Sequence, residues 1–107
     1  MIKVSIMYPY SKDARFDVAY YADVHMPMSI DLVKGHPGFR NVIVEMGLSG
    51  VVPGSDPEYV SICNYIFASV EDFWEATLPH GETLQNDMLK CTDITPIIQI
   101  SDVVISQ

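Results

Sequence analysis

The sequence has 107 residues, 49% of them hydrophobic and 19% charged, and its formal net charge is −8. This length predicts one compact domain over residues 1–107, and the composition predicts a packed core, which excludes a disordered chain. The negative charge repels phosphate backbones and anionic lipid surfaces, so we expect neither nucleic acid nor a membrane surface as a partner. No run of about 18 apolar residues occurs, which excludes a membrane-spanning helix.

The two cysteines, Cys63 and Cys91, stand outside any CxxC or Cys/His metal spacing. We therefore expect free thiols and no disulfide framework. The opening MIKVSIMY alternates like a strand and lacks the basic and long apolar regions of a secretory signal. These features predict a cytoplasmic protein.

The first half of the chain predicts a strand, a helix and a second strand. Residues 2–8 (IKVSIMY) alternate with the period of two that is typical of a strand. After a polar break, a helix is expected from Phe16 to about Gly35, because glycine favours a helix end. Residues 36–48 predict the second strand, and the glycine- and proline-rich residues 49–58 predict a loop.

The second half predicts a strand, a broken helix and a last strand. Residues 59–67 (YVSICNYIF) form the expected third strand, and Ser69 is a candidate N-cap for the helix that follows. Pro79 predicts an interruption of this helix, with one or two further turns over residues 82–89. Residues 95–106 predict the fourth strand.

This order predicts a ferredoxin-like α+β fold, βαββαβ, in which two helices cover one face of a four-stranded antiparallel sheet. The third and fourth strands carry apolar residues on both faces, although two helices can cover only one. We therefore expect two sheets to pack face to face in a homodimer. The alternative is a monomer with a mildly apolar, exposed sheet.

The stretch YYADVHMP, residues 20–27, places a histidine within the apolar side of the first helix. At helical spacing, one stripe contains Val18, Tyr21, His25, Met28 and Leu32. Pro27 removes a backbone hydrogen bond and clashes with the carbonyl of Asp23, so the helix should bend or loosen at His25. A bend there would open a cavity between helix and sheet.

Two interpretations of His25 follow. It is either a core histidine that a neighbour satisfies by hydrogen bonding, or a residue of a binding site. The kinking proline, the adaptable Met28 and the nearby Tyr21 favour a pocket, in which a neutral imidazole could act as general base or acid.

Other candidates carry two interpretations each. His80 is either a pocket wall or an exposed turn residue, and Asp93 either binds a ligand or caps a turn. Tyr8 and Tyr65 are either core residues or polar contacts for a ligand. His36 lies at a predicted helix end, where a positive charge interacts favourably with the helix dipole, so a structural role is expected for it. The three histidines form no HExxH-like pattern, so no metal site is expected.

Four segments together resemble the EthD family, named for ethyl tert-butyl ether degradation, within the dimeric α+β barrel group: MIKVSIMYP, ARFDVAYYADVHMPMS, FASVEDFWEATLPHGETLQND and CTDITPIIQISDVV. The resemblance implies a ferredoxin-like subunit whose sheet pairs with a second copy. His25 matches the family's histidine, with Tyr20, Tyr21 and Pro27 as its neighbours. His80 and Asp93 match more loosely.

The resemblance also implies an auxiliary catabolic enzyme that acts on a small hydrophobic, oxygenated or aromatic compound. It further implies a functional link to an oxygenase such as a cytochrome P450 system. Its wider group includes cofactor-independent oxidoreductases, lactone isomerases and polyketide-type decarboxylases and cyclases, so no cofactor is expected. In this view His25 shuttles a proton or polarises an oxygen. The alternative is a non-catalytic binder or carrier of a hydrophobic intermediate.

Overall fold

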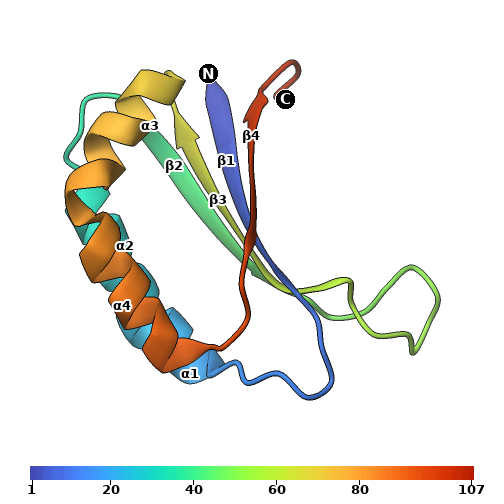
Figure 1. The fold of residues 1–107 in the computed structure, drawn as a ribbon. Helices are drawn as coiled ribbons and strands as arrows, with labels where there is room; N and C mark the ends of the chain where they lie inside the picture. Colours follow the sequence, from blue (N-terminus) through green and yellow to red (C-terminus); the bar gives the residue numbers. More distant parts are fainter.

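The computed structural model describes residues 1–107 and contains one sheet with all its helices on one face (Figure 1). The strand order is β2-β3-β1-β4, and every neighbouring pair is antiparallel. The strands are β1 (Ile2–Pro9), β2 (Phe39–Met46), β3 (Tyr59–Phe67) and β4 (Ile97–Asp102). This arrangement confirms the predicted ferredoxin-like α+β fold.

The first helical segment contains a wide turn at the predicted position. It consists of α1 (Val18–Tyr20), the π-helical η1 (Tyr21–His25) and α2 (Met26–Val33). Since Pro27 has no N–H for the carbonyl of Asp23, a regular α-helical bond is impossible there. The N–H of Met26 instead donates to the carbonyl of Tyr21, five residues earlier, which widens the turn.

The wide turn changes which side chains face the core. The π-helical turn contains one extra residue, which rotates the side chains that follow it about the helix axis. Residues 29 and 33 therefore face the core in place of the expected residues 28 and 32. Ser29 and Val33 are buried, whereas Met28 is only half-buried and Val18 is 46% exposed. Tyr21 and His25, which lie within the π-helical turn, are buried as the stripe predicted.

The second helical segment is longer than the sequence suggested. It consists of α3 (Val70–Thr77), the 3-10 turn η2 (Leu78–His80) and α4 (Gly81–Cys91). The Ser69 hydroxyl accepts a hydrogen bond from the N–H of Asp72 at 3.1 Å, which confirms the predicted cap. The guanidinium of Arg15 donates to the last carbonyls of α4, and this long-range cap stabilises the extra turns.

Two strands are shorter than expected, since β2 spans only Phe39–Met46 and β4 only Ile97–Asp102. Residues 36–38 form a turn in which the N–H of Gly38 donates to Nδ1 of His36. The loop between β2 and β3 extends away from the sheet on the side opposite the helices (Figure 1). Both cysteines are buried free thiols.

The core lies between the helices and the sheet. Its largest buried side chains come from β1, β3 and the helices, and include Val4, Tyr21, Val33, Tyr65, Phe67 and Phe73. None of the helices combines the length and the apolar character that a lipid bilayer requires of a spanning segment.

Candidate functional site

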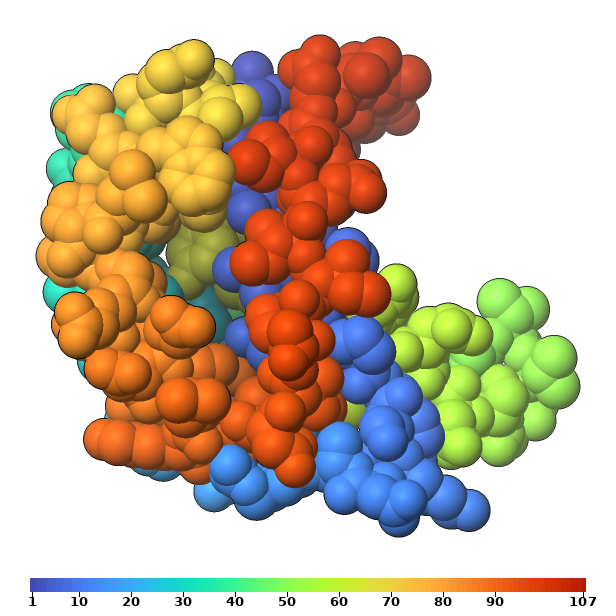
Figure 2. All heavy atoms as spheres, in the orientation of Figure 1, coloured from blue at the N-terminus to red at the C-terminus, as the bar shows by residue number.

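A cavity of about 530 Å³ lies between the helices and the helix-facing side of the sheet. In Figure 2 the surface is hollowed between the helices (orange and yellow) and β4 (red). Hydrophobic residues make up 13 of the 22 that line it, so its wall is mostly apolar with a few polar groups. Small-molecule sites generally have this size and composition.

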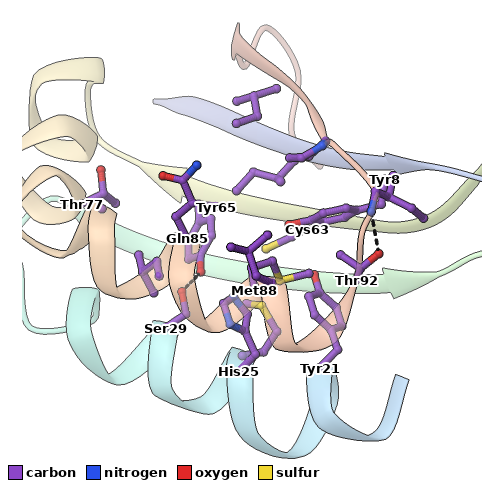
Figure 3. A pocket seen from close by; sticks show the side chains of 18 of the residues that line it. Tyr8, Tyr21, His25, Ser29, Cys63, Tyr65, Thr77, Gln85, Met88 and Thr92 are labelled. Carbon is purple, nitrogen blue, oxygen red and sulfur yellow. Dashed lines mark hydrogen bonds between the residues drawn. The ribbon is translucent and has the colours of Figure 1, made fainter. Parts of the chain in front are cut away.

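Five of the seven predicted site residues line this cavity: Tyr8, Tyr21, His25, Tyr65 and Asp93. Figure 3 shows Tyr21, His25 and Ser29 extending from the first helical segment, while Tyr8, Cys63 and Tyr65 extend from the sheet. Met28 lies outside the cavity because the π-helical turn rotates Ser29 into the place that Met28 was expected to take. His80 also lies outside, half-buried in the 3-10 turn.

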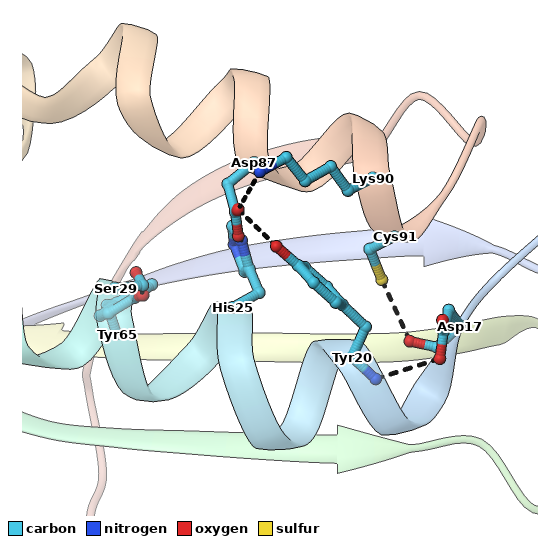
Figure 4. Close-up of polar contacts among 8 residues, drawn as sticks. All are labelled: Asp17, Tyr20, His25, Ser29, Tyr65, Asp87, Lys90 and Cys91. Atoms are coloured by element: carbon cyan, nitrogen blue, oxygen red, sulfur yellow. Dashed lines mark hydrogen bonds and ion pairs between the residues drawn. The ribbon is translucent and has the colours of Figure 1, made fainter.

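His25 is paired with a carboxylate that the sequence analysis missed. Its Nδ1 lies 2.9 Å from Oδ2 of Asp87 on α4 (Figure 4). The His25 side chain is only 8% exposed and that of Asp87 only 12%, so water screens this pair little. The pair therefore joins the two helical segments, and its histidine also lines the cavity.

The pairing sets the tautomer of His25. Because an ionised carboxylate only accepts hydrogen bonds, Nδ1 of His25 must carry the proton that it donates to Asp87. In the neutral ring the other nitrogen, Nε2, then has a free lone pair, and no protein group bonds it. Since His25 lines the cavity, this lone pair can accept a proton from a bound molecule.

Tyr20 holds Asp87 in its ionised form. The Tyr20 hydroxyl donates to Oδ1 of Asp87 at 2.6 Å, and this bond, followed by the one from His25, lowers the pKa of Asp87. The same bond raises the pKa of Tyr20. Lys90 adds a weaker contact at 3.6 Å. Both oxygens of Asp87 are thus occupied, which fixes the carboxylate and the imidazole that it orients.

The phenols and the thiol that line the cavity are neutral. Burial raises the pKa of Tyr8, Tyr21 and Tyr65 well above its ordinary value, and it raises that of the Cys63 thiol to about 12. The hydroxyls of Ser29 and Tyr65 are hydrogen-bonded to each other. At neutral pH the phenols and the thiol therefore offer uncharged donors and acceptors.

Several cavity residues were not predicted, among them Asp87's neighbours on α4, Gln85 and Met88, together with Ser29, Cys63 and Thr92. Asp87 lies 62 residues from His25, in a segment that was expected to form only one or two helical turns. The spacing of apolar residues gives no information about a carboxylate on the polar side of a distant helix.

One cluster elsewhere could offer ligand atoms to a cation. One atom each of His36, Asp72 and Glu75 lies within 4.8 Å of the others. Nδ1 of His36, however, accepts the N–H of Gly38, which places the ring proton on Nε2, next to Glu75. A cation would have to displace that proton, and the cluster is not part of the cavity.

This chain is similar to several solved structures, among them the following three. An EthD-like protein from Ralstonia eutropha is 42% identical, covers 99% of this chain and 94% of its own length, and superposes with a TM-score of 0.91. An ethyl tert-butyl ether degradation (EthD) family protein from Bacillus halodurans is 18% identical, covering 97% and 99% of the two chains with a TM-score of 0.68.

A proposed monooxygenase from Shewanella loihica is 14% identical, with 98% and 95% coverage and a TM-score of 0.62. At such low identity the second and third structures show a shared fold alone. No family model and no curated protein sequence matches the chain. The 42% identity over nearly its whole length shows that this chain belongs to the EthD family.

Proposed function

We propose that this protein is an enzyme that moves a proton to or from a small, hydrophobic, oxygenated compound held in the cavity. His25 is the proposed acid-base residue, and Asp87 is the residue that positions it. The proposal rests on the 2.9 Å contact between buried His25 and partly buried Asp87, beside a mostly apolar cavity of about 530 Å³. The proposal needs no metal and no cofactor.

Family membership supports the general setting of this activity. The EthD family is associated with oxygenases, and we propose an auxiliary role beside one, such as a cytochrome P450 system, that supplies the oxygenated compound. A π-helical turn at His25 is a further supporting feature, since such turns occur frequently at functional sites.

Deuterium exchange into acetophenone tests this proposal. Acetophenone fits the expected ligand class, and NMR in D₂O follows the loss of its methyl protons as they exchange. We expect the wild type to accelerate this exchange and His25→Gln to lower the rate by 10²-fold or more, the usual contribution of an acid-base group. Glutamine keeps hydrogen-bonding capacity but cannot accept the proton.

His36→Gln is the matched control, because it removes a histidine outside the cavity. Its exchange rate should equal that of the wild type. Acetophenone affinity, measured on the same samples, separates chemistry from binding. Saturable binding without accelerated exchange in the wild type would indicate a carrier instead of an enzyme, and equal rates in the wild type and His25→Gln would remove His25 from the reaction.

We also propose that a second copy covers the open face of the sheet. Exposed Ile43 and Ile97 lie on this face, around a network in which Asn64 accepts from Ser5 and donates to Glu45. The loop beside it exposes Leu48, Val51 and Val52. Apolar area of this kind supports self-association. Sedimentation at micromolar concentration should give the mass of a dimer, and a monomer would contradict the proposal.

A further inference from the structure

Two of the three tyrosines that line the cavity have occupied hydroxyl groups. The Tyr65 hydroxyl is hydrogen-bonded to that of Ser29 and also lies against the Cys63 thiol. The Tyr21 hydroxyl is sealed from the cavity, against the Ser61 hydroxyl and the same thiol. A ligand in the cavity therefore meets the rings of these two tyrosines, while their hydroxyls are taken by the protein.

Tyr8 differs from both, because its hydroxyl has no partner in the protein. The residue is only 5% exposed, and Figure 3 shows its ring pointing from the sheet into the cavity beside Cys63. The surrounding atoms do not seal its oxygen, unlike that of Tyr21. In an empty cavity only water is able to bond this hydroxyl, so a ligand that displaces the water has to replace the hydrogen bond.

The charges of the wall select an uncharged ligand. No lysine or arginine lines the cavity, and the one acidic residue of the lining, Asp93, is exposed and accepts the backbone N–H of Arg15. The guanidinium of Arg15 is occupied by the last carbonyls of α4, and His25 is already paired with Asp87. A carboxylate or phosphate would therefore lose its hydration here without gaining a counter-charge.

Tyr8 and His25 present their open groups to the same part of the cavity. The ring of Tyr21 packs against both, with centroid distances of 6.3 Å to Tyr8 and 6.0 Å to His25. Tyr8 extends from β1 and His25 from the first helical segment, so they reach the cavity from opposite walls (Figure 3). A small molecule that bonds Tyr8 through an oxygen is thus held near Nε2 of His25.

We infer that the ligand is an uncharged compound with an oxygen that hydrogen-bonds to the Tyr8 hydroxyl, and that Tyr8 determines the preference for oxygenated over hydrocarbon ligands. This inference rests on the proposed function, since the compound that Tyr8 recognises is the one whose proton His25 moves. Burial raises the pKa of Tyr8 well above its ordinary value, so the phenol stays neutral and orients the ligand without exchanging a proton with it.

Calorimetric titration with three probes of similar shape tests this inference: acetophenone, α-methylstyrene, in which CH₂ replaces the carbonyl oxygen, and benzoate. The ratio of acetophenone affinity to α-methylstyrene affinity is compared between variants, which cancels the different hydrophobicity of the two probes. We expect this ratio to fall about tenfold from the wild type to Tyr8→Phe, the effect of one buried hydrogen bond. Benzoate should not bind at concentrations at which acetophenone saturates.

Tyr21→Phe is the matched variant, because it removes a sealed hydroxyl from the same cavity. Its affinity ratio should equal that of the wild type. Tyr8→Phe should keep the wild-type melting temperature, since the substitution breaks no hydrogen bond within the protein.

Four results would overturn the inference: an unchanged ratio in Tyr8→Phe, an equal fall of the ratio in Tyr21→Phe, benzoate binding, or a lowered melting temperature of Tyr8→Phe. The proposed function would still stand in each case, because proton exchange and its dependence on His25 are measured separately. Failure of both neutral probes to bind the wild type would overturn the inference and the proposed function together.

Discussion

Two histidines, one in the middle of the first helical segment and one in the turn that follows it, both face a carboxylate of the second segment. His25 donates from Nδ1 to Asp87 at 2.9 Å, while Nε2 of His36 lies 3.4 Å from Glu75. The side chain of Asp87 is 12% exposed and that of Glu75 is 74% exposed. The first pair is shielded from water, and the second is a surface contact.

The two rings also carry their protons on opposite nitrogens. Nδ1 of His36 is occupied by the N–H of Gly38, so that ring has no free lone pair. His25 uses Nδ1 as a donor and keeps Nε2 free at the cavity. The nitrogen that the fold leaves free, and not the presence of a nearby carboxylate, therefore separates a potential base from a structural histidine.

Replacing each of the two carboxylates separately should give the largest difference in exchange rate between the two histidine pairs. Asp87→Asn should lower the rate of acetophenone exchange at least tenfold, because a neutral amide can present oxygen or nitrogen to Nδ1 and no longer fixes the tautomer. Glu75→Gln should leave the rate unchanged. Nitrogen-15 NMR of the ring should show mixed tautomers of His25 in Asp87→Asn, and a single wild-type tautomer there would contradict this role.

Glycine substitutions should show that the His36 end is closely packed. A Cβ at Gly38 would lie 2.5 Å from Cβ of Asp72, so Gly38→Ala should destabilise the fold by about 1–3 kcal/mol. Gly35 has open space around it, and Gly35→Ala should be neutral or stabilise by about 0.4–1 kcal/mol. Urea denaturation measures both changes. Equal free energies of unfolding for Gly38→Ala and Gly35→Ala would contradict this prediction. They would mean that the turn at residues 36–38 accommodates the added Cβ without cost.

The smallest expected effect is on the stability of the fold at acidic pH, through the network of Asp87 and His25. The lowered pKa of Asp87 means that its ionised network stabilises the fold above about pH 4, and that this contribution is lost as the pH falls through the lowered value. Tyr20→Phe removes the main cause of the shift, so its stability should fall at a higher pH than that of the wild type.

Denaturation midpoints across the acid range measure this difference, which should be constant above about pH 5 and should shrink as Asp87 becomes protonated. Tyr10→Phe is the control, because its hydroxyl makes no side-chain hydrogen bond on the exposed surface. A pH-independent difference between Tyr20→Phe and the wild type would indicate that Tyr20 acts through packing alone.

Much of the fold could be predicted because its signals are local. Alternation over residues 2–8 and 59–67 predicted β1 and β3, and Ser69 predicted the start of α3. Pro27 predicted a disturbance at His25, because a proline affects the carbonyl four residues earlier in any helix. These effects act over a few residues, so the sequence by itself determined them.

Tertiary structure decided the chemistry of the site. Pro27 could be accommodated by a kink or by a wide turn, and only packing against the sheet selected the π-helical turn that moves Ser29 inward in place of Met28. The pairing of His25 with Asp87 depends on how α4 lies along the first segment, which Arg15 anchors at its end. Hydrogen bonds between residues 62 positions apart require this three-dimensional register, which no local pattern encodes.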